Sequence, residues 1–258
     1  MGSPHVAVVT GASSGIGAAI AARLAAEEAL VFVCGRNAER TSAVAASLGE
    51  FGGRARPIRL DVANPASIRA AVDTIRDAAA DVGPVDWLVN NAGMARSAPL
   101  LQRDGDPTDP YTEHLAVNFH GARLMIEALL PAMLERRYGR VVNVASSAGL
   151  HGYPYVSAYC ASKHALVGYS RAAALELART GVGVNLVCPH YVDSPMTDRS
   201  VQNVMEKTGR TEAEARAFFA SQNPGGRLVA PETVAAAVRE LLVGERTGMI
   251  VELDGSEA

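Results

Sequence analysis

The residues with the clearest chemical pattern are Tyr159 and Lys163, which lie four positions apart in the run Tyr-Cys-Ala-Ser-Lys. The phenol of a tyrosine titrates at about pH 10, so an isolated tyrosine is a poor acid or base at neutral pH. A nearby cation stabilises the phenolate and lowers its pKa, and side chains four positions apart share one face of a helix. The pair therefore predicts a proton-transfer site, although the same spacing also occurs on solvated helix faces.

A hydroxyl group upstream can complete such a site. Ser146 precedes Tyr159 by twelve intervening residues and follows an apolar run from Val141 to Ala145. An apolar run of this length is typical of a buried strand, and α/β proteins bind their ligands at the carboxyl edge of the sheet. We therefore expect Ser146 to present its hydroxyl at that edge.

The elements that position these residues are short β-branched runs alternating with longer Ala- and Leu-rich segments. The predicted strands are His5–Thr10, Leu30–Gly35, Ala55–Leu60, Val85–Asn90, Arg140–Ser146, Gly183–Val187 and Met249–Leu253. The predicted helices are Gly15–Ala29, Ala38–Glu50, Pro65–Asp81, Tyr111–Arg137, Ser157–Thr180 and Pro231–Val243. Strands that are apolar throughout favour a parallel sheet covered on both faces. Right-handed crossovers then favour a Rossmann-type, doubly wound α/β fold, in a single domain over residues 1–258.

One segment, at about 190–227, departs from this alternation. It contains Pro195 and Pro224 and two polar helical pieces, near Thr197–Lys207 and Thr211–Ser221. An excursion of this length within a compact domain is typical of a lid or binding loop. The alternative is a surface insertion without a function of its own.

The segment Thr10–Gly17, Thr-Gly-Ala-Ser-Ser-Gly-Ile-Gly, joins the first predicted strand to the first predicted helix. Glycines allow a tight turn and a close approach to a diphosphate, whose charge is favoured at a helix N-terminus. The glycine spacing differs from G-x-G-x-x-G, so a purely structural turn is the alternative. The position directly after the first strand favours a cofactor site. The predicted contacts are Gly11, Ser13, Ser14, Gly15, Ile16 and Gly17.

The end of the second predicted strand bears on the choice of cofactor. NAD sites usually have a carboxylate there, which binds the ribose 2′-hydroxyl. This chain has Gly35 and Arg36 instead, with no acidic residue nearby. A guanidinium is suited to binding a phosphate, whereas the alternative for Arg36 is an ordinary exposed residue at a helix start. We therefore predict NADP(H) in preference to NAD(H).

Further polar residues follow the third and fourth predicted strands and fall on the same edge of the sheet. Asp61, next to Val62, is placed to contact adenine. Asn90 serves either the cofactor or a link between neighbouring strands, and it is followed by Ala92 and Gly93. We include all five among the predicted cofactor contacts.

Taken together, the chain resembles the classical short-chain dehydrogenase/reductase family in ordered motifs, which are Thr10–Gly17, Asn90–Gly93, Asn118, Ser146, Tyr159 and Lys163. The resemblance runs almost from end to end. It implies a Rossmann-type sheet of about seven strands, a nicotinamide cofactor, and hydride transfer between a ketone and a secondary alcohol.

The resemblance also implies roles for individual residues. Tyr159 would be the general acid in reduction and the general base in oxidation, and Lys163 would hold the nicotinamide ribose and lower the tyrosine pKa. Ser146 would donate a hydrogen bond to the substrate oxygen; the interval to Tyr159 favours it over Ser147. Asn118 would hold a water that links Lys163 to solvent.

The chain departs from the family after the sixth predicted strand. Where the family typically has Pro-Gly, this chain has Pro189-His190. His190 either shapes or polarises the substrate pocket, or it is a tolerated backbone variant. Ser194 stands in the place of the usual Thr, and with Pro189 and Val192 it completes the predicted cofactor contacts.

The segments around Tyr159 are similar to bacterial ketoreductases of aromatic polyketide and 3-oxoacyl thioester metabolism. The predicted substrate is therefore a β-ketoacyl thioester or a bulky polyketide-like ketone. The alternative is a free hydrophobic ketone or alcohol, such as an aryl ketone or a steroid. A nucleotide-sensing protein without catalysis is a third hypothesis, but it would have no physical reason to keep all four catalytic residues.

Composition bears on whether the protein binds nucleic acid, a metal ion or a membrane. The chain has 258 residues, is 48% hydrophobic and carries a formal charge of −3, which gives no basic face for nucleic acid. Its three cysteines match no metal-ligand or disulfide framework, so no metal is expected. No apolar stretch is long enough for a bilayer, and no signal-peptide pattern is present. We therefore expect a cytoplasmic protein without nucleic-acid or membrane partners.

Small residues, among them Ala158, Ala161 and Ala165, recur along the predicted helix that carries Tyr159. Small side chains allow close helix packing, and in the family this helix and the preceding long helix form the subunit interface. The resemblance therefore implies a homotetramer, with a dimer as the alternative.

Overall fold

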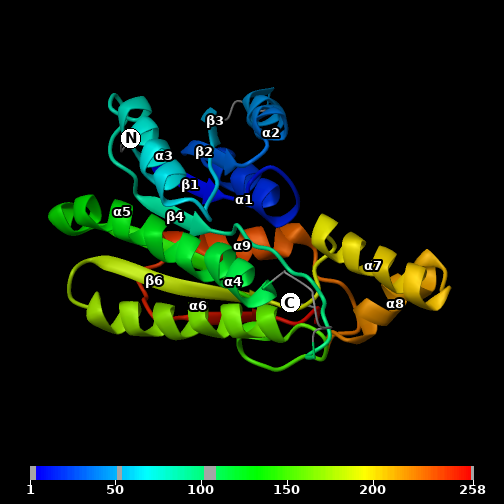
Figure 1. Cartoon of the computed structure of the whole chain (residues 1–258). Helices are drawn as coiled ribbons and strands as arrows, with labels where there is room; N and C mark the ends of the chain where they lie inside the picture. The colour runs from blue at the N-terminus through cyan, green and yellow to red at the C-terminus, as the bar shows by residue number, and fades with distance from the viewer. Residues whose placement is uncertain (1–3, 51–53, 102–108, 257–258) are drawn as a thin grey trace.

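The computed structural model describes residues 4–50, 54–101 and 109–256, and its centre is a parallel sheet. The strand order is β3-β2-β1-β4-β5-β6-β7 (Figure 1). The strands are β1 (Val6–Thr10), β2 (Leu30–Gly35), β3 (Arg54–Arg59), β4 (Trp87–Asn90), β5 (Gly139–Val144), β6 (Val182–Pro189) and β7 (Ile250–Leu253). The order reverses between β1 and β4, which confirms the predicted doubly wound fold and places a ligand crevice at that edge.

Helices cover both faces of the sheet (Figure 1). One face is covered by α1 (Gly15–Ala25), α2 (Ala38–Glu50) and α9 (Pro231–Val243). The other is covered by α3 (Pro65–Ala78), α5 (Gly121–Arg136) and α6 (Ser157–Glu176). Because both faces are covered, the central strands are apolar throughout: every residue of β1 and β2 is buried.

The two outer strands are less buried. In β3, Arg54, Arg56 and Arg59 lie on the edge of the sheet together with Pro57. Charged residues and proline on an edge strand discourage pairing with another chain. The opposite edge strand, β7, is only partly buried.

The prediction of one continuous helix over Tyr111–Arg137 is wrong. The structure has α4 (Pro110–Leu115), a π-helical turn η1 (Ala116–His120) and then α5. A π turn inserts one extra residue into the helix and is frequent at functional sites. Here it contains the buried Asn118, and it precedes Gly121, where an added Cβ would lie 2.7 Å from Val62 Cβ.

Strand β5 also ends earlier than expected, at Val144 instead of Ser146. Ser146 is instead the N-cap of a short 3₁₀ turn, η2 (Ser147–Gly149), and its Oγ accepts a hydrogen bond from Ala148 N at 3.1 Å. A serine side chain competes for nearby backbone donors in this way, which favours a cap over a strand interior.

The segment at 190–227 contains both expected helices, α7 (Pro195–Thr208) and α8 (Glu212–Ser221). Figure 1 shows them standing away from the sheet at one end of the molecule. Val201, Ala215 and Phe219 form a small buried cluster between them that is separate from the two main cores. These two helices therefore pack on each other through an apolar contact of their own.

Among the described residues, no helix has the length and apolar character needed to cross a membrane. Within the same ranges, no group of His, Cys, Asp and Glu side chains is placed to hold a metal ion. The three cysteines, Cys34, Cys160 and Cys188, are buried and unpaired with one another.

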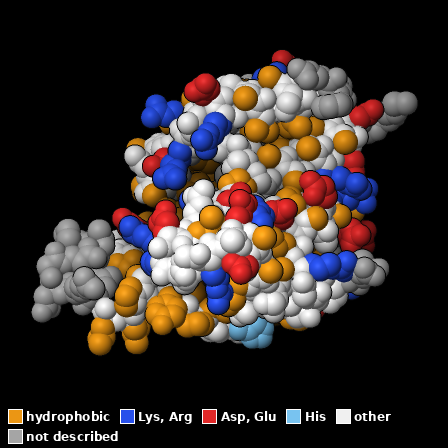
Figure 2. All heavy atoms as spheres, turned by 90° about the vertical axis from the view of Figure 1, so that its right-hand side faces the viewer, with side chains coloured by type: hydrophobic (Ala, Val, Ile, Leu, Met, Phe, Trp, Pro, Cys, Tyr) orange, Lys and Arg blue, Asp and Glu red, His pale blue; other side chains and the backbone are white. Residues whose placement is uncertain are grey.

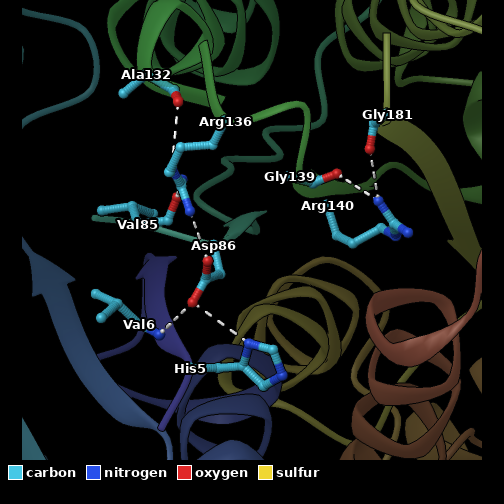
Figure 3. Close-up of polar contacts among 9 residues, drawn as sticks. All are labelled: His5, Val6, Val85, Asp86, Ala132, Arg136, Gly139, Arg140 and Gly181. Atoms are coloured by element: carbon cyan, nitrogen blue, oxygen red, sulfur yellow. Dashed lines mark hydrogen bonds and ion pairs between the residues drawn. The ribbon is translucent and has the colours of Figure 1, made fainter. Parts of the chain in front are cut away.

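At the amino ends of the strands, Asp86 joins three parts of the chain (Figure 3). Its carboxylate accepts hydrogen bonds from Val6 N at 3.1 Å and from Arg136 Nη1 at 2.9 Å, and it lies 3.3 Å from His5 Nδ1. Only 16% of the Asp86 side chain is exposed. The carboxylate thus links the start of β1 and the start of β4 to the end of α5.

Asp86→Ala should therefore lower the free energy of unfolding by about 1–3 kcal/mol, because it leaves partly buried donors without their acceptor. Urea unfolding measures the change. The matched control is Asp73→Ala, which removes an ion pair with Arg76 whose side chains are 70% and 66% exposed; exposed pairs contribute little. Equal effects of the two substitutions would contradict the assignment.

Candidate active site

The glycine turn after β1 has geometry that only glycine fits. Gly11 has a φ of +65°, and an added Cβ would lie 2.7 Å from Ala92 Cα. At Gly17 an added Cβ would lie 2.3 Å from Gly11 O. Ser14, the N-cap of α1, is extended and makes no side-chain cap hydrogen bond. The first turn of α1 therefore keeps backbone N–H groups for an anionic ligand.

A pair of residues that the sequence analysis missed holds this turn to the end of β4. Asn91 Nδ2 donates to Thr10 O at 3.0 Å and to Gly11 O at 3.2 Å. In return, Thr10 Oγ1 accepts from Asn91 N at 3.1 Å and from Ala92 N at 3.0 Å. The only signal in the sequence was the doubled asparagine after a predicted strand.

Asn90 makes the link between strands that is one of its two expected roles, and its contact with a cofactor stays a prediction. It is 4% exposed, and its Nδ2 donates to Asn143 Oδ1 on β5 at 2.9 Å. Asn143 Nδ2 in turn donates to Ser170 Oγ on α6 at 2.8 Å. The Asn90 side chain therefore links neighbouring strands and the catalytic helix.

The residues predicted to choose the cofactor lie at the carboxyl end of β2. Gly35 is its last residue, and an added Cβ would lie 3.3 Å from Ser13 Cβ in the glycine turn. Arg36 follows; it is exposed and has no hydrogen bond or ion pair with any residue that the structure describes. A phosphate beside the glycine turn would find this guanidinium free to bind it.

Asp61 and Val62, the two cofactor contacts predicted after the third strand, have different surroundings in the structure. One Asp61 carboxylate oxygen accepts a hydrogen bond from Ala63 N at 3.0 Å, and its contact with adenine stays a prediction. Val62 is 7% exposed and packs into the core beside Gly121. A contact of Val62 with a cofactor would therefore have to be made by its backbone.

Lys163 is the most buried cation of the site, with 4% of its surface exposed. Its Nζ donates to Val144 O, the last residue of β5, at 2.9 Å and lies 5.8 Å from the ring centroid of Tyr159. The turn after β4 borders the amine, since an added Cβ on Gly93 would lie at ordinary contact distance from Nζ, 3.7 Å. Burial lowers the pKa of Lys163 to about 8, against a small opposing effect of Cys188.

The pKa of Tyr159 differs from the value expected from the sequence. Burial raises the pKa of its phenol to about 12, although a hydrogen bond with Ser146 acts in the opposite direction. Lys163 is not among the groups that shift this pKa in the chain alone, and desolvation of the phenolate is the largest cause. The phenol is therefore held neutral.

The side chain of Asn118 forms hydrogen bonds with other residues of the chain. The side-chain Oδ1 accepts from Met94 N at 2.8 Å, and Nδ2 donates to Met94 O and to Ser162 Oγ, both at 2.9 Å. The side chain therefore fixes the segment after β4 against α6. The expected water link to Lys163 stays a prediction.

The residues after β6 meet the glycine turn from the other side. Ser194 is the N-cap of α7, and an added Cβ on Gly15 would lie 3.6 Å from Ser194 Cβ and 3.1 Å from Pro195 Cδ. Val192 is buried and forms an isolated bridge with Val229. Pro189 is the last residue of β6.

His190 stands in the place of the family's glycine and makes a side-chain contact of its own. Its backbone is not in the left-handed region, and 7% of its side chain is exposed. Its Nε2 lies 2.8 Å from Glu252 Oε1 on β7, and His151 Nε2 lies 3.4 Å from the same oxygen. The side chain thus links β7 to the turns around the site, while a role toward substrate stays a prediction.

Comparison with known proteins agrees with this geometry. A family model described as short chain dehydrogenase matches residues 5–204. A protein named as a ketoacyl reductase of the granaticin polyketide synthase of Streptomyces violaceoruber is 37% identical over 96% of this chain and 89% of its own length. The 3-oxoacyl-(acyl-carrier-protein) reductase FabG of Escherichia coli is 34% identical over 97% of this chain and 96% of its own length.

Solved structures give the same result. A crystal structure of a variant of actinorhodin polyketide ketoreductase with NADPH has a TM-score of 0.89 and 36% identity, and the match covers 98% of this chain and 96% of that chain. The chain therefore belongs to the short-chain dehydrogenase/reductase family, close to the polyketide and 3-oxoacyl ketoreductases. It is an oxidoreductase of that family.

The buried amine predicts a pH dependence of stability. The pKa of Lys163 falls from 10.5 to about 8 on folding, so between these values the unfolded chain binds more protons and stability rises with pH. Relative to Lys163→Met, the wild type should gain up to about 1.4 kcal/mol per pH unit there. Urea unfolding between about pH 8 and 10 measures this, and the titration of Tyr159 cancels because both proteins contain it.

The chain offers a matched control, because its only other lysine is the exposed Lys207. Lys207→Met should leave the slope of stability against pH at its wild-type value. If Lys163→Met also left it unchanged, the amine would not be desolvated as the structure indicates.

Proposed function

We propose that this protein is an NADP(H)-dependent ketoreductase that reduces a β-ketoacyl thioester or a bulky polyketide-like ketone to its alcohol. The observation that carries the proposal is the convergence of Ser146, Tyr159 and Lys163 at the carboxyl edge of the sheet, next to the glycine turn. A hydroxyl donor, a neutral phenol and a buried amine are the groups that carbonyl reduction needs.

The proposed roles follow from the protonation states. A phenol with a pKa of about 12 is protonated at neutral pH, so Tyr159 can donate its proton to the carbonyl oxygen as negative charge develops there. Ser146 donates a hydrogen bond to the same oxygen and stabilises that charge. Lys163, with a pKa of about 8, holds a proton at neutral pH and can return one toward the phenolate.

The residues around the glycine turn fit a dinucleotide. The close backbone approaches at Gly11 and Gly17 shape the turn at the N-terminus of α1, and Gly93 lies beside the amine of Lys163. Arg36 would hold the 2′-phosphate, and Ser194 would contact the nicotinamide end. When bound, the nicotinamide supplies the hydride.

Support for the substrate class comes from the relatives and from the surface. The similar proteins are named for ketoacyl and 3-oxoacyl substrates. Leu100, Leu101 and Tyr155, in turns on the carboxyl side of the sheet, are 76%, 86% and 70% exposed. Figure 2, which faces the end of the molecule with α7 and α8, shows hydrophobic side chains gathered at its lower edge. An apolar rim suits a long acyl chain or a polyketide chain.

The remaining parts of the proposal concern the lid and the assembly. Segment 190–227 would close over the substrate as a unit, since α7 and α8 share their own apolar cluster.

On α6, an outward-facing stripe contains Ala161, Gly168 and Leu175, and Leu175 is 81% exposed. Nothing lies within 4 Å of an added Cβ on Gly168. We propose that this stripe packs against a second copy in a homotetramer or dimer.

Tyr159→Phe should lower kcat for reduction of a β-ketoacyl thioester by roughly 10²- to 10⁴-fold, because it removes the proton donor and keeps the ring. The NADPH dissociation constant should stay close to the wild-type value. Steady-state rates and a cofactor fluorescence titration measure the two effects. Tyr138→Phe is the control, since this tyrosine lies near His5 at the amino ends of the strands, away from the site; substantial activity in Tyr159→Phe would overturn the assignment.

Arg36→Ala should weaken NADPH binding by roughly 10- to 100-fold, the effect of losing charge-assisted hydrogen bonds to a phosphate. NADH binding should change much less, because NADH lacks the 2′-phosphate. Arg179→Ala is the control, since this exposed arginine follows the far end of α6. Equal losses for the two cofactors would show that Arg36 serves the fold instead.

A further inference from the structure

The segment 94–98, which follows β4, is held by backbone hydrogen bonds at every second residue. Met94 N donates to Asn118 Oδ1 at 2.8 Å, and Ala98 N donates to Tyr155 O at 2.8 Å. Between them, Arg96 N donates to Nε2 of His114 at 3.1 Å. The three acceptors come from η1, from α4 and from the turn that leads into α6. The segment therefore lies across the elements that carry the catalytic residues.

His114 is the unusual member of this set, because a titratable side chain takes the place of a backbone or amide oxygen. It is completely buried. Since a backbone N–H can only donate, Nε2 must be the bare nitrogen of the ring, and the proton is on Nδ1. Nδ1 then donates to Pro110 O, 2.5 Å away in the first turn of α4. Both ring nitrogens are thus satisfied by the neutral imidazole in one tautomer.

The same ring contacts the catalytic tyrosine. The ring centroids of His114 and Tyr159 are 6.3 Å apart with an interplanar angle of 71°, an edge-to-face arrangement that is favourable for aromatic pairs. The side chain thus bonds to the 94–98 segment through one nitrogen and packs against the proton donor with its ring. None of the reactions proposed for the site uses His114 chemically.

The far anchor of the segment carries backbone strain. Tyr155, whose carbonyl binds Ala98 N, has a φ of +64°, which is rare for a bulky residue. Such a conformation is strained and persists only where the surroundings hold it. A hollow beside it is lined by Ala98, Pro99 and Tyr111, among others, and by Ala158, the residue before Tyr159. The segment is therefore held in place at the edge of the active site.

We propose that His114 is a positioning residue of the active site, which sets the 94–98 segment and the ring of Tyr159 in one fixed relation. The neutral imidazole supplies the acceptor for Arg96 N and the edge for the phenol. Loss of the acceptor would release the middle of the segment, so the carbonyl of the substrate would be held less accurately over Tyr159. For its kinetic part, this inference rests on the proposed reductase function.

Two substitutions separate the two contacts. His114→Phe keeps an aromatic edge against Tyr159 but removes the acceptor, whereas His114→Gln keeps an acceptor oxygen near the position of Nε2. The Phe variant should lose about 10- to 100-fold in kcat/KM for the ketone, mainly through KM, because a small misplacement of reacting groups has effects of this size. The NADPH dissociation constant should stay within about twofold. The Gln variant should recover most of the loss.

Hydrogen exchange tests the contact without any substrate. The amide of Arg96 should exchange faster in the Phe variant than in the wild type and the Gln variant. His120→Phe, an exposed position in η1, is the matched control and should change neither measurement. Should the Phe variant fail to fold, His114→Ala takes its place in both comparisons.

The inference would be overturned by wild-type kcat/KM or unchanged Arg96 exchange in the Phe variant. Equal losses in the Phe and Gln variants, or a parallel loss of NADPH affinity, would also overturn it, because they indicate general damage to the fold. Full activity of Tyr159→Phe would remove the proposed reaction, while the exchange of Arg96 would still decide whether His114 holds the segment.

Discussion

Burial of the Lys163 amine is the constraint on which the rest of the site depends. A charged amine away from water is costly unless it is hydrogen-bonded, and the partner within the described chain is one carbonyl, Val144 O, at 2.9 Å. That carbonyl belongs to the last residue of β5, just before the chain turns into η2. The turn after β4 lies against the amine at Gly93. The end of β5, the turn after β4 and the first turns of α6 must therefore all be placed together.

The loops at this edge of the sheet are held by asparagine side chains, of which Asn118 and Asn223 are buried. Asn91 binds two carbonyls of the glycine turn, Asn118 binds both backbone groups of Met94, and Asn223 binds both backbone groups of Tyr191 at 2.9 Å. Loops that leave a sheet lose their ladder partners, and buried backbone groups must find others. An amide carries both a donor and an acceptor, so one asparagine can replace a strand partner. Rigid loops at this edge follow from that chemistry.

The same burial moves the pKa values of the two titrating groups apart. The pKa of Tyr159 rises to about 12 while that of Lys163 falls to about 8, in both cases because desolvation disfavours the charged form. The result is a neutral phenol beside an amine that exchanges its proton near physiological pH. This arrangement suits a site that gives a proton to a carbonyl and then recovers it.

Much of this protein was determined by local sequence. The apolar runs at β1, β2 and β5 indicate strands buried on both faces, and the alternation with helices then leaves few topologies, so the doubly wound sheet was predictable. The spacing from Tyr159 to Lys163 indicates one helix face. The glycine spacing from Gly11 to Gly17 was also informative, because a close approach of the backbone requires glycine, and glycines can be read directly from the sequence.

Tertiary structure alone decided the features that depend on contacts distant in sequence. The π turn at Asn118 exists where the side chain meets Met94 and Ser162, and no local pattern in 110–136 signals it. The raised pKa of Tyr159 reflects desolvation by the folded chain, whereas the sequence argument counted only the nearby charge. No sequence pattern singled out His114, because its role depends on contacts with Arg96 N and the Tyr159 ring that form only in the folded chain. Propensity and spacing report on neighbours along the chain, while burial and long-range hydrogen bonds exist only once the sheet has brought its carboxyl ends together.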